Sequence, residues 1–310
     1  MNETVLIVQA ACLTIIGAST PLLFAALGEL VTERSGVLNL GIEGMMLMGA
    51  VAAFGGTLLT GDIYLGLLCG GMAGMSVALL HGFLTLSLLT NQVATGLAIT
   101  LFGVGLSALL GIGFVGATVE PLAKLPIPLL SQIPFLGPVL FDHNPLIYLS
   151  VALVVGLHFF IYHSRGGLVL RAIGESPDSA HALGYSVIKL RYAALLFGGC
   201  MAGLGGAYLS VVYTPMWSEN MTAGRGWVAL ALVVFASWRP LRCLFGAYMF
   251  GGITIVQLHA QGFGLSIPSQ FLSMLPYLAT VVVLVLISRD RTRLRENSPA
   301  SLGKPFRPSA

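Results

Sequence analysis

The sequence predicts an all-α, polytopic integral membrane protein with about nine (8–10) transmembrane helices. Charged residues are only 9% of the 310 residues, hydrophobic residues are 56%, and the mean hydropathy is +0.91, whereas soluble domains carry about a quarter charged residues. Uncharged runs long enough to cross about 30 Å of hydrocarbon recur along the chain. Among the 39 glycines, Gly70-xxx-Gly74 and Gly199-xxx-Gly203 have the spacing that lets transmembrane helices pack closely.

About nine apolar runs, each with at most one charged residue, are expected to cross the membrane. In order they are Thr4–Gly28, Val37–Gly61, two runs within Ile63–Val119 that meet at Thr90–Gln92, Pro145–Ser164, Tyr192–Ser218, Gly226–Trp238 and two runs within Cys243–Ser288. The polar patch Glu29–Ser35 is expected to end the first span. Residues 1–290 are thus predicted to form one membrane domain, and residues 291–310 a basic, disordered cytoplasmic tail.

Charge decides the expected orientation. Gly116–Asn144 holds too many prolines for one helix and is expected to form a structured external loop. With nine spans, all but two of the 15 lysines and arginines lie on the opposite side, the exceptions being Lys124 and Arg225. Since basic residues near span ends stay in the cytoplasm, the carboxyl terminus is expected there and the amino terminus outside. The short run Gly226–Trp238 rises only about 20 Å as a helix, yet it must cross to keep this asymmetry.

The segment Arg165–Arg191 gathers charge between two long uncharged runs. Ser176, Pro177 and Asp178 form a helix start, because the hydroxyl can cap, proline suits the first turn and the acid faces the positive end of the dipole. Gly184 is expected to end this helix after about two turns, too short to be stable alone in water. Its surface of small residues, which includes Ala180 and Ala182, suits docking into a groove of another protein. An ordinary cytoplasmic loop is the alternative.

Three motifs carry a resemblance to a known family. They are the stretch Pro21–Gly44, the stretch Asn91–Gly96, and Arg171–Glu175 followed by Ala180–Gly184. Together they resemble the membrane permease subunits of bacterial ABC importers, in the branch that includes simple-sugar and branched-chain amino-acid permeases, and most closely its nucleoside-uptake members. The resemblance covers nearly the whole chain.

The resemblance implies a multi-pass protein of the bacterial inner membrane that forms the path for a nucleoside, with a simple sugar or branched-chain amino acid as the alternative cargo. It implies three protein partners: an ATPase subunit, a second, homologous permease, and a periplasmic or lipoprotein substrate-binding protein. It further implies that Glu175–Gly184 is the coupling helix, with Glu175, Asp178, Ala180 and Gly184 meeting the ATPase.

No residue pattern predicts catalysis by this chain. It has no Gly-x-x-x-x-Gly-Lys-Ser/Thr loop, and Leu302–Pro305 cannot replace one, so ATP and Mg²⁺ are expected to act in a separate ATPase subunit. The four cysteines lie in apolar runs without paired spacing, so neither a metal site nor a bound cofactor is predicted. Nothing indicates nucleic acid as a partner, and the only other contact expected is membrane lipid.

Five polar residues are candidates for the cargo path. Asn39 and Glu43 are spaced i, i+4, and a carboxylate within a span is a functional candidate by default. The alternative is that Glu43 pairs with Arg34 or caps backbone groups. Asn91, Gln92 and Thr95 can hydrogen-bond a ribose or a base, or else satisfy backbone groups at a helix junction. A different class of protein, an ion-coupled secondary transporter with Glu43 as proton carrier, stays open until an ATPase requirement is tested.

Overall fold

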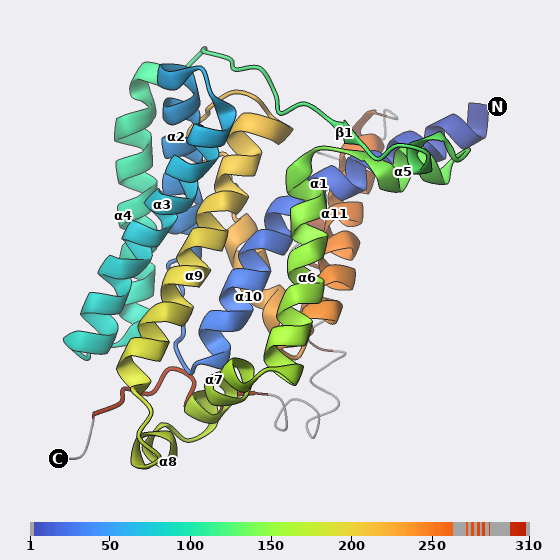
Figure 1. The fold of residues 1–310 in the computed structure, drawn as a ribbon. Coiled ribbons are helices and arrows are strands. Elements are labelled where there is room, and N and C mark those ends of the chain that lie inside the picture. The colour runs from blue at the N-terminus through green and yellow to red at the C-terminus, as the bar shows by residue number, and fades with distance from the viewer. Residues whose placement is uncertain are drawn as a thin grey trace.

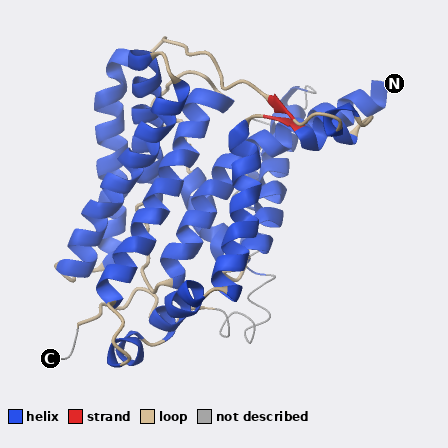
Figure 2. Ribbon diagram, in the orientation of Figure 1, coloured by secondary structure: helices blue, strands red, loops and turns tan. Residues whose placement is uncertain are grey.

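The structure is a computed structural model that describes residues 3–262 and 298–307, together with the positions 271, 274, 275, 278, 279, 281, 282 and 285 between them. The described ranges contain eleven α-helices and one pair of two-residue strands, β1 (Leu125–Pro126) and β2 (Asp142–His143). Most of the ribbon in Figure 2 is helix. The predicted all-α membrane class is confirmed.

Six helices in the described part are long and apolar enough to cross a membrane, counting short extensions at the ends of three of them. They are α1 (Glu3–Arg34), α2 (Ile42–Thr60), α3 (Ile63–Gly82), α4 (Gln92–Gly111), α6 (Pro145–His163) and α9 (Val187–Tyr208). α11 (Pro240–Gly262) is similarly long at 23 residues, whereas α10 (Arg225–Phe235) has 11. Most of the last predicted span lies outside the described residues, so the count of nine stays a prediction.

The helices run side by side in one bundle (Figure 1), and glycines set the spacing where α3 meets α9. A Cβ atom at Gly74 would lie 2.2 Å from the carbonyl oxygen of Gly199, and one at Gly203 would lie 2.3 Å from the carbonyl oxygen of Gly70. No larger residue fits at such distances. The close packing predicted from the two glycine pairs is confirmed.

The junction between α1 and α2 differs from the prediction. The first span does not end at Gly28, because α1 continues through the polar patch to Arg34. Glu29 and Glu33 can stay in the helix, almost fully buried, since Glu29 receives hydrogen bonds from Asn39 in the following loop and Glu33 receives one from the distant Trp238. Residues 35–41 are non-helical and α2 begins only at Ile42, not near Val37.

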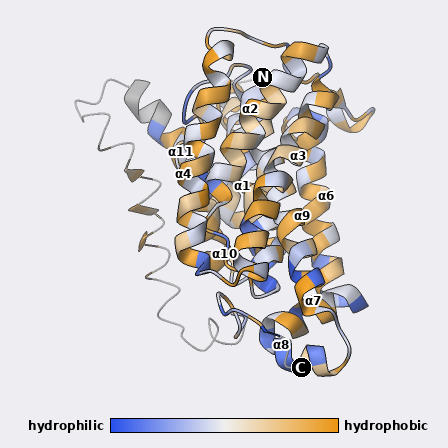
Figure 3. Ribbon diagram, turned by 90° about the vertical axis from the view of Figure 1, so that its left-hand side faces the viewer, coloured by the Kyte–Doolittle hydropathy of each residue, from blue (hydrophilic) through white to orange (hydrophobic). Residues whose placement is uncertain are grey.

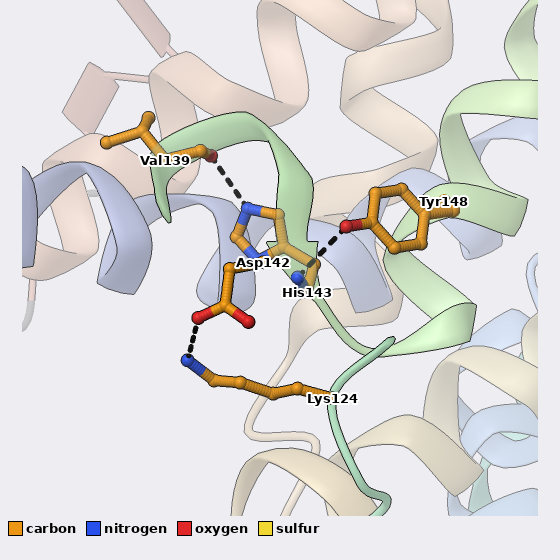
Figure 4. A network of polar contacts seen from close by, with 5 residues as sticks. All are labelled: Lys124, Val139, Asp142, His143 and Tyr148. Atoms are coloured by element: carbon orange, nitrogen blue, oxygen red, sulfur yellow. Dashed lines mark hydrogen bonds and ion pairs between the residues drawn. The ribbon is translucent and has the colours of Figure 1, made fainter. Parts of the chain in front are cut away.

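The loop between α4 and α6 is folded, as predicted for Gly116–Asn144. It contains β1, β2 and the short helix α5 (Leu136–Phe141). A polar network closes it (Figure 4): Nζ of Lys124 lies 2.8 Å from Oδ2 of Asp142, and the ring of His143 bonds a backbone carbonyl of α5. The loop thus presents a defined surface at this end of the bundle.

The opposite end of the bundle carries α7 (Arg165–Glu175), α8 (Pro177–Ala182) and residues 298–307 (Figures 1 and 3). The segments predicted to be cytoplasmic meet here, because the end of α1 bonds both the residues after α10 and the start of α9. The expectation of a disordered tail does not hold for residues 298–307, which bond α7 and α9. The membrane side that this end faces stays a prediction.

Candidate functional site

Two serines shape the segment that protrudes from the bundle. Oγ of Ser164 caps α7 by accepting a backbone N–H of the first turn at 3.0 Å. Ser176 caps α8 in the same way, accepting the N–H of Ser179, and Pro177 occupies the first turn. The chain leaves this helix through Gly184, whose φ of +88° favours glycine. The short helix predicted from these residues is confirmed as α8.

The outer surface of this segment combines charge with an apolar tip. Glu175 and Asp178 are exposed. The side chain of Leu183 is 77% exposed and that of Tyr185 43% exposed, on either side of the exposed Gly184. These two large apolar side chains lie together at the tip of the segment and are the candidates for a protein contact there. Sequence reasoning missed Leu183, although a lone leucine before a helix-ending glycine in a charged segment was a visible signal.

Ala180 is not part of this outer surface. Its side chain is 2% exposed and packs with Ile173, Val187 and Phe306 of the same chain. The prediction that Ala180 faces the groove of another protein is therefore wrong, because the amphipathic turn of α8 points this residue at the bundle. Ala182 does lie on the exposed side.

Inside the bundle, Asn39 is fully buried and donates hydrogen bonds to the carboxylate of Glu29. Its Nδ2 donates to Oε2 of Glu29 at 3.1 Å and its backbone N–H donates to Oε1 at 3.2 Å. Its own Oδ1 accepts the N–H of Gly41 at 3.1 Å. Because α2 begins after Asn39, this residue and Glu43 do not share a helix face as predicted.

Glu43 caps the start of α10. Its Oε1 accepts hydrogen bonds from Thr222 Oγ1 and from the N–H of Gly224 at 2.8 Å, and its Oε2 accepts the N–H of Gly226 at 2.6 Å. A carboxylate at a helix N-terminus satisfies free donors and complements the dipole. Glu43 thus caps backbone groups, one of the two structural alternatives, and its partners lie at the start of α10 and just before it, rather than being Arg34.

The other end of α10 is held by α1. Nε and Nη2 of Arg34 donate to the carbonyl oxygen of Trp238 at 3.3 and 3.0 Å, and the indole N–H of Trp238 donates to Glu33. Ser237 and Trp238 both have positive φ, 50° and 53°, an uncommon conformation that needs support from the surroundings. α10 is therefore a short helix bounded at each end by side chains of the first two helices.

After a π-helical turn at Leu209–Tyr213, the chain that leads to α10 enters the bundle without regular structure. Near its start Trp217 packs against Gly111, the last residue of α4, and where α10 begins Gly226 packs against Glu43 in the first turn of α2. Figure 1 shows α10 in the half of the bundle nearer α7. Irregular backbone at membrane depth is tolerated where it is buried in protein or lines a water-filled cavity.

This irregular segment is polar and partly open. Ser218, Glu219 and Asn220 are exposed. A cavity of about 170 Å³ lies against it, lined by Leu209, Tyr213, Thr214, Met216, Ser218, Met221 and Arg225. Arg225, expected on the external side just before the span Gly226–Trp238, is the first residue of α10, where its Nη1 donates to the carbonyls of Met221 and Thr222.

The three polar residues predicted at the α3–α4 junction have structural partners. Oδ1 of Asn91 caps α4 through two backbone N–H groups, each at 3.0 Å. Oε1 of Gln92 accepts the N–H of Leu38 at 2.8 Å, which ties α4 to the loop that carries Asn39. The hydroxyl of Thr95 lies 2.8 Å from that of Thr90. The structure does not bring Asn91 or Thr95 to Glu43.

No group of three or more His, Cys, Asp or Glu in the described ranges is placed to hold a metal ion. The buried carboxylates of α1 and α2 serve hydrogen-bond donors of the chain itself. These carboxylates therefore connect the helices of the bundle to one another and to the loops between them.

Comparisons with known proteins agree with this arrangement. A family model described as the permease component of branched-chain amino acid transport systems matches residues 11–287. Over 301 residues the chain is 41% identical to the putative glucose ABC transporter permease protein TsgC13 of Haloferax volcanii, covering 89% of this chain and 92% of that protein.

Two further relatives are named for nucleosides. The chain is 31% identical over 281 residues to the nucleoside ABC transporter permease protein NupC of Lactococcus lactis, covering 86% and 89% of the two chains. It is also 31% identical over 302 residues to the guanosine ABC transporter permease protein NupQ of Bacillus subtilis, covering 93% of each. No solved structure matches the chain.

Proposed function

Since this chain belongs to the family of permease components of branched-chain amino acid transport systems, and is a membrane permease subunit of the ABC type, we propose that it carries nucleosides into the cell. The observation that carries the choice of cargo is the full-length similarity to two permeases named for nucleosides. The polar segment before α10 supports it, because hydroxyl, amide and guanidinium groups suit an uncharged solute with many hydrogen-bonding groups.

A sugar is the second candidate cargo. The 41% identity to a putative glucose permease favours it, and a nucleoside shares its hydroxyl-bearing ring with a sugar. The two cargoes differ in the base, which adds an aromatic face and further donors and acceptors. Competition between them in one uptake assay therefore decides the question.

In the proposed mechanism the chain hydrolyses nothing itself and no bond in the cargo is broken. A separate ATPase subunit, using ATP and Mg²⁺, seats on the outer surface of α8 around Leu183, with Glu175, Asp178 and Gly184 beside it. A second, homologous permease faces the polar segment at Ser218–Asn220 across the path, because exposed polar groups at membrane depth are costly against lipid. An external binding protein delivers cargo to the loop between α4 and α6.

The half-length α10 is the proposed inner wall of this path. Helices that start within the bundle place free N–H groups and a positive dipole end beside the cargo of many transporters. Here Glu43 already occupies that end, so the neighbouring Ser218, Asn220 and Arg225 are the proposed cargo contacts. Oε2 accepts from α10 and Oε1 from the residues just before it, so an anchoring role fits Glu43 better than the proton-carrying role of a secondary transporter.

Uptake in intact cells tests the proposal. Cells that lack other nucleoside systems and carry this chain with its ATPase, partner permease and binding protein should accumulate labelled guanosine, and excess unlabelled glucose should not compete. The same cells without this chain are the control. Accumulation of glucose with no competition by nucleosides would select the sugar alternative, and uptake that does not require the ATPase would reject the mechanism.

A further inference from the structure

Residues 299–307, here called the C-terminal strap, cross the same end of the bundle as α7 and α8 (Figure 1). Within the strap, Ser301 and Phe306 are buried. A nine-residue segment with no helix or strand of its own is held in place only if its polar groups find partners. The partners of its polar groups therefore identify the elements that the strap connects.

Ser301 fastens the strap to the end of α7. Both its backbone N–H and its Oγ reach the carbonyl oxygen of Gly174, at 2.9 and 2.7 Å. Gly174 itself has no room for a side chain, since a Cβ atom there would lie 2.1 Å from the carbonyl oxygen of Arg34. The strap is thus bonded to the end of α7, and the end of α7 packs directly on the end of α1.

Arg191, in the first turns of α9, binds both the strap and the loop that follows α1. Its side chain is only 1% exposed. Nε donates to the carbonyl oxygen of Ser35 at 3.1 Å, Nη2 to Oγ of Ser301 at 3.1 Å, and Nη1 to the carbonyl oxygen of Lys304 at 3.2 Å. The rigid fork of donors of a guanidinium suits three acceptors on two segments, one in the α1–α2 loop and two in the strap.

The loop that follows α1 is shaped to receive the strap. Gly36 has a φ of +89°, and a Cβ atom there would lie 2.4 Å from Oγ of Ser301 and 2.8 Å from Nη2 of Arg191. Its carbonyl oxygen accepts the N–H of Gly303 at 3.1 Å. Only glycine fits at this position, both for its backbone conformation and for the space.

Phe306 anchors the far end of the strap on α8. Its ring packs in a small cluster with Ile173, Ala180 and Val187, apart from the main core of the bundle. The ring of His181 stands edge-on to it with centroids 5.7 Å apart, a favoured aromatic geometry. The inner face of α8 therefore rests on the strap as well as on α7 and α9.

We propose that the C-terminal strap and Arg191 make α8 move as one body with the α1–α2 loop. α8 has six residues, too few to be a rigid lever alone. Through Phe306, Ser301 and Gly36 a displacement of α8 reaches the loop whose Asn39 holds Glu29. Arg191 is thus a positioning residue that passes motor movement to α1 and α2. This inference rests on the proposed coupling to an ATPase and not on the identity of the cargo.

Removing the strap is the direct test. A chain truncated after Asn297 is compared with one truncated after Arg307, both purified with the ATPase, partner permease and binding protein in lipid vesicles. We expect the two to retain equal amounts of ATPase, because the outer surface of α8 is unchanged. Solute taken up per ATP hydrolysed should fall about tenfold in the shorter chain only, as when coupling contacts are lost. Equal uptake per ATP in both would overturn the proposal.

A point variant guards against a folding artefact. Arg191→Gln keeps the strap but removes the three-way bridge, and Lys189→Gln, two residues away on an exposed position, is the matched control. Uptake per ATP should fall in the first and stay unchanged in the second, with Arg191→Lys rescuing only part of the loss. If Arg191→Gln lowered protein abundance and uptake in the same proportion and left uptake per ATP unchanged, Arg191 would contribute to folding only.

The outcomes separate this inference from the proposed function. If the intact chain itself binds no ATPase, the proposed function fails. If the intact chain couples and the chain ending at Asn297 couples equally well, only the strap is refuted.

Discussion

Glu43→Gln tests whether a carboxylate of α2 holds the start of α10. The carboxylate is 3% exposed and receives one hydroxyl and two backbone N–H groups. The glutamine amide has only one acceptor oxygen. Its NH₂ group therefore faces either the N–H of Gly226 or the donors of Thr222 and Gly224, and those donors lose their acceptor. Losing a hydrogen bond to a charged group and leaving a buried donor unpaired costs roughly 2–4 kcal/mol.

That free energy should appear as local opening of α10. At 1.4 kcal/mol per factor of ten, amide hydrogen exchange at Gly224 and Gly226 should accelerate roughly 30- to 700-fold. Peptides covering these residues can be followed by mass spectrometry in detergent. Glu219→Gln is the matched control, because it makes the same change in an exposed residue of the same segment and should leave the exchange rate unaltered.

The two readings of Glu43 predict different results. If Glu43 were a proton carrier without a capping role, the variant would lose transport while amide exchange at Gly226 stayed within about threefold of the parent. Such a result would refute the capping argument. Gly226→Ala offers a second route to the same contact, since its Cβ atom would lie 2.7 Å from the backbone of Glu43 and should open α10 without changing any charge.

Three further substitutions test the exposed tip, the buried face of α8 and the helix packing. Leu183→Ser should abolish co-purification of the ATPase while the variant stays at normal abundance in the membrane. Leu168→Ser, at a 59% exposed position on α7, should not. Equal retention of the ATPase by both variants would show that Leu183 lies outside the interface. Ala180→Asp should make α8 sensitive to limited proteolysis even without the ATPase, because it buries a charge within the chain itself. Gly74→Val should deplete the protein from the membrane, since α3 and α9 touch at this glycine. Gly113→Ala, which places its Cβ atom in open space, should be tolerated. Normal abundance of the valine variant would contradict the close packing of α3 on α9.

Sequence patterns located the elements whose causes are local. The uncharged runs correspond to α2, α3, α4, α6 and α9, and caps such as Asn91 and Ser176 mark helix starts through side chains two or three residues from the groups they satisfy. A cap acts within its own turn. Local chemistry of this kind is readable from a short window of sequence.

The errors arose where partners lie far apart in the chain. Glu33 stays inside α1 because of Trp238, 205 residues away, and Glu43 is satisfied by Thr222, 179 residues away. A window around either acid contains only a polar patch or an isolated charge. Burial of Ala180 had the same origin, since the cover over it is supplied by Phe306 near the end of the chain.

The buried acids and bases also indicate which parts of the bundle move together. Glu43 holds one end of α10 and Arg34 the other, so α10 cannot shift without α1 and α2. The loop between α1 and α2 is in turn bonded to Arg191 at Ser35. A displacement at α8 therefore needs only the strap and one loop to reach both anchors of α10. The charged residues of this membrane protein join its short and irregular segments to its long helices, and in the proposed mechanism these are the contacts through which the ATPase acts within the bundle.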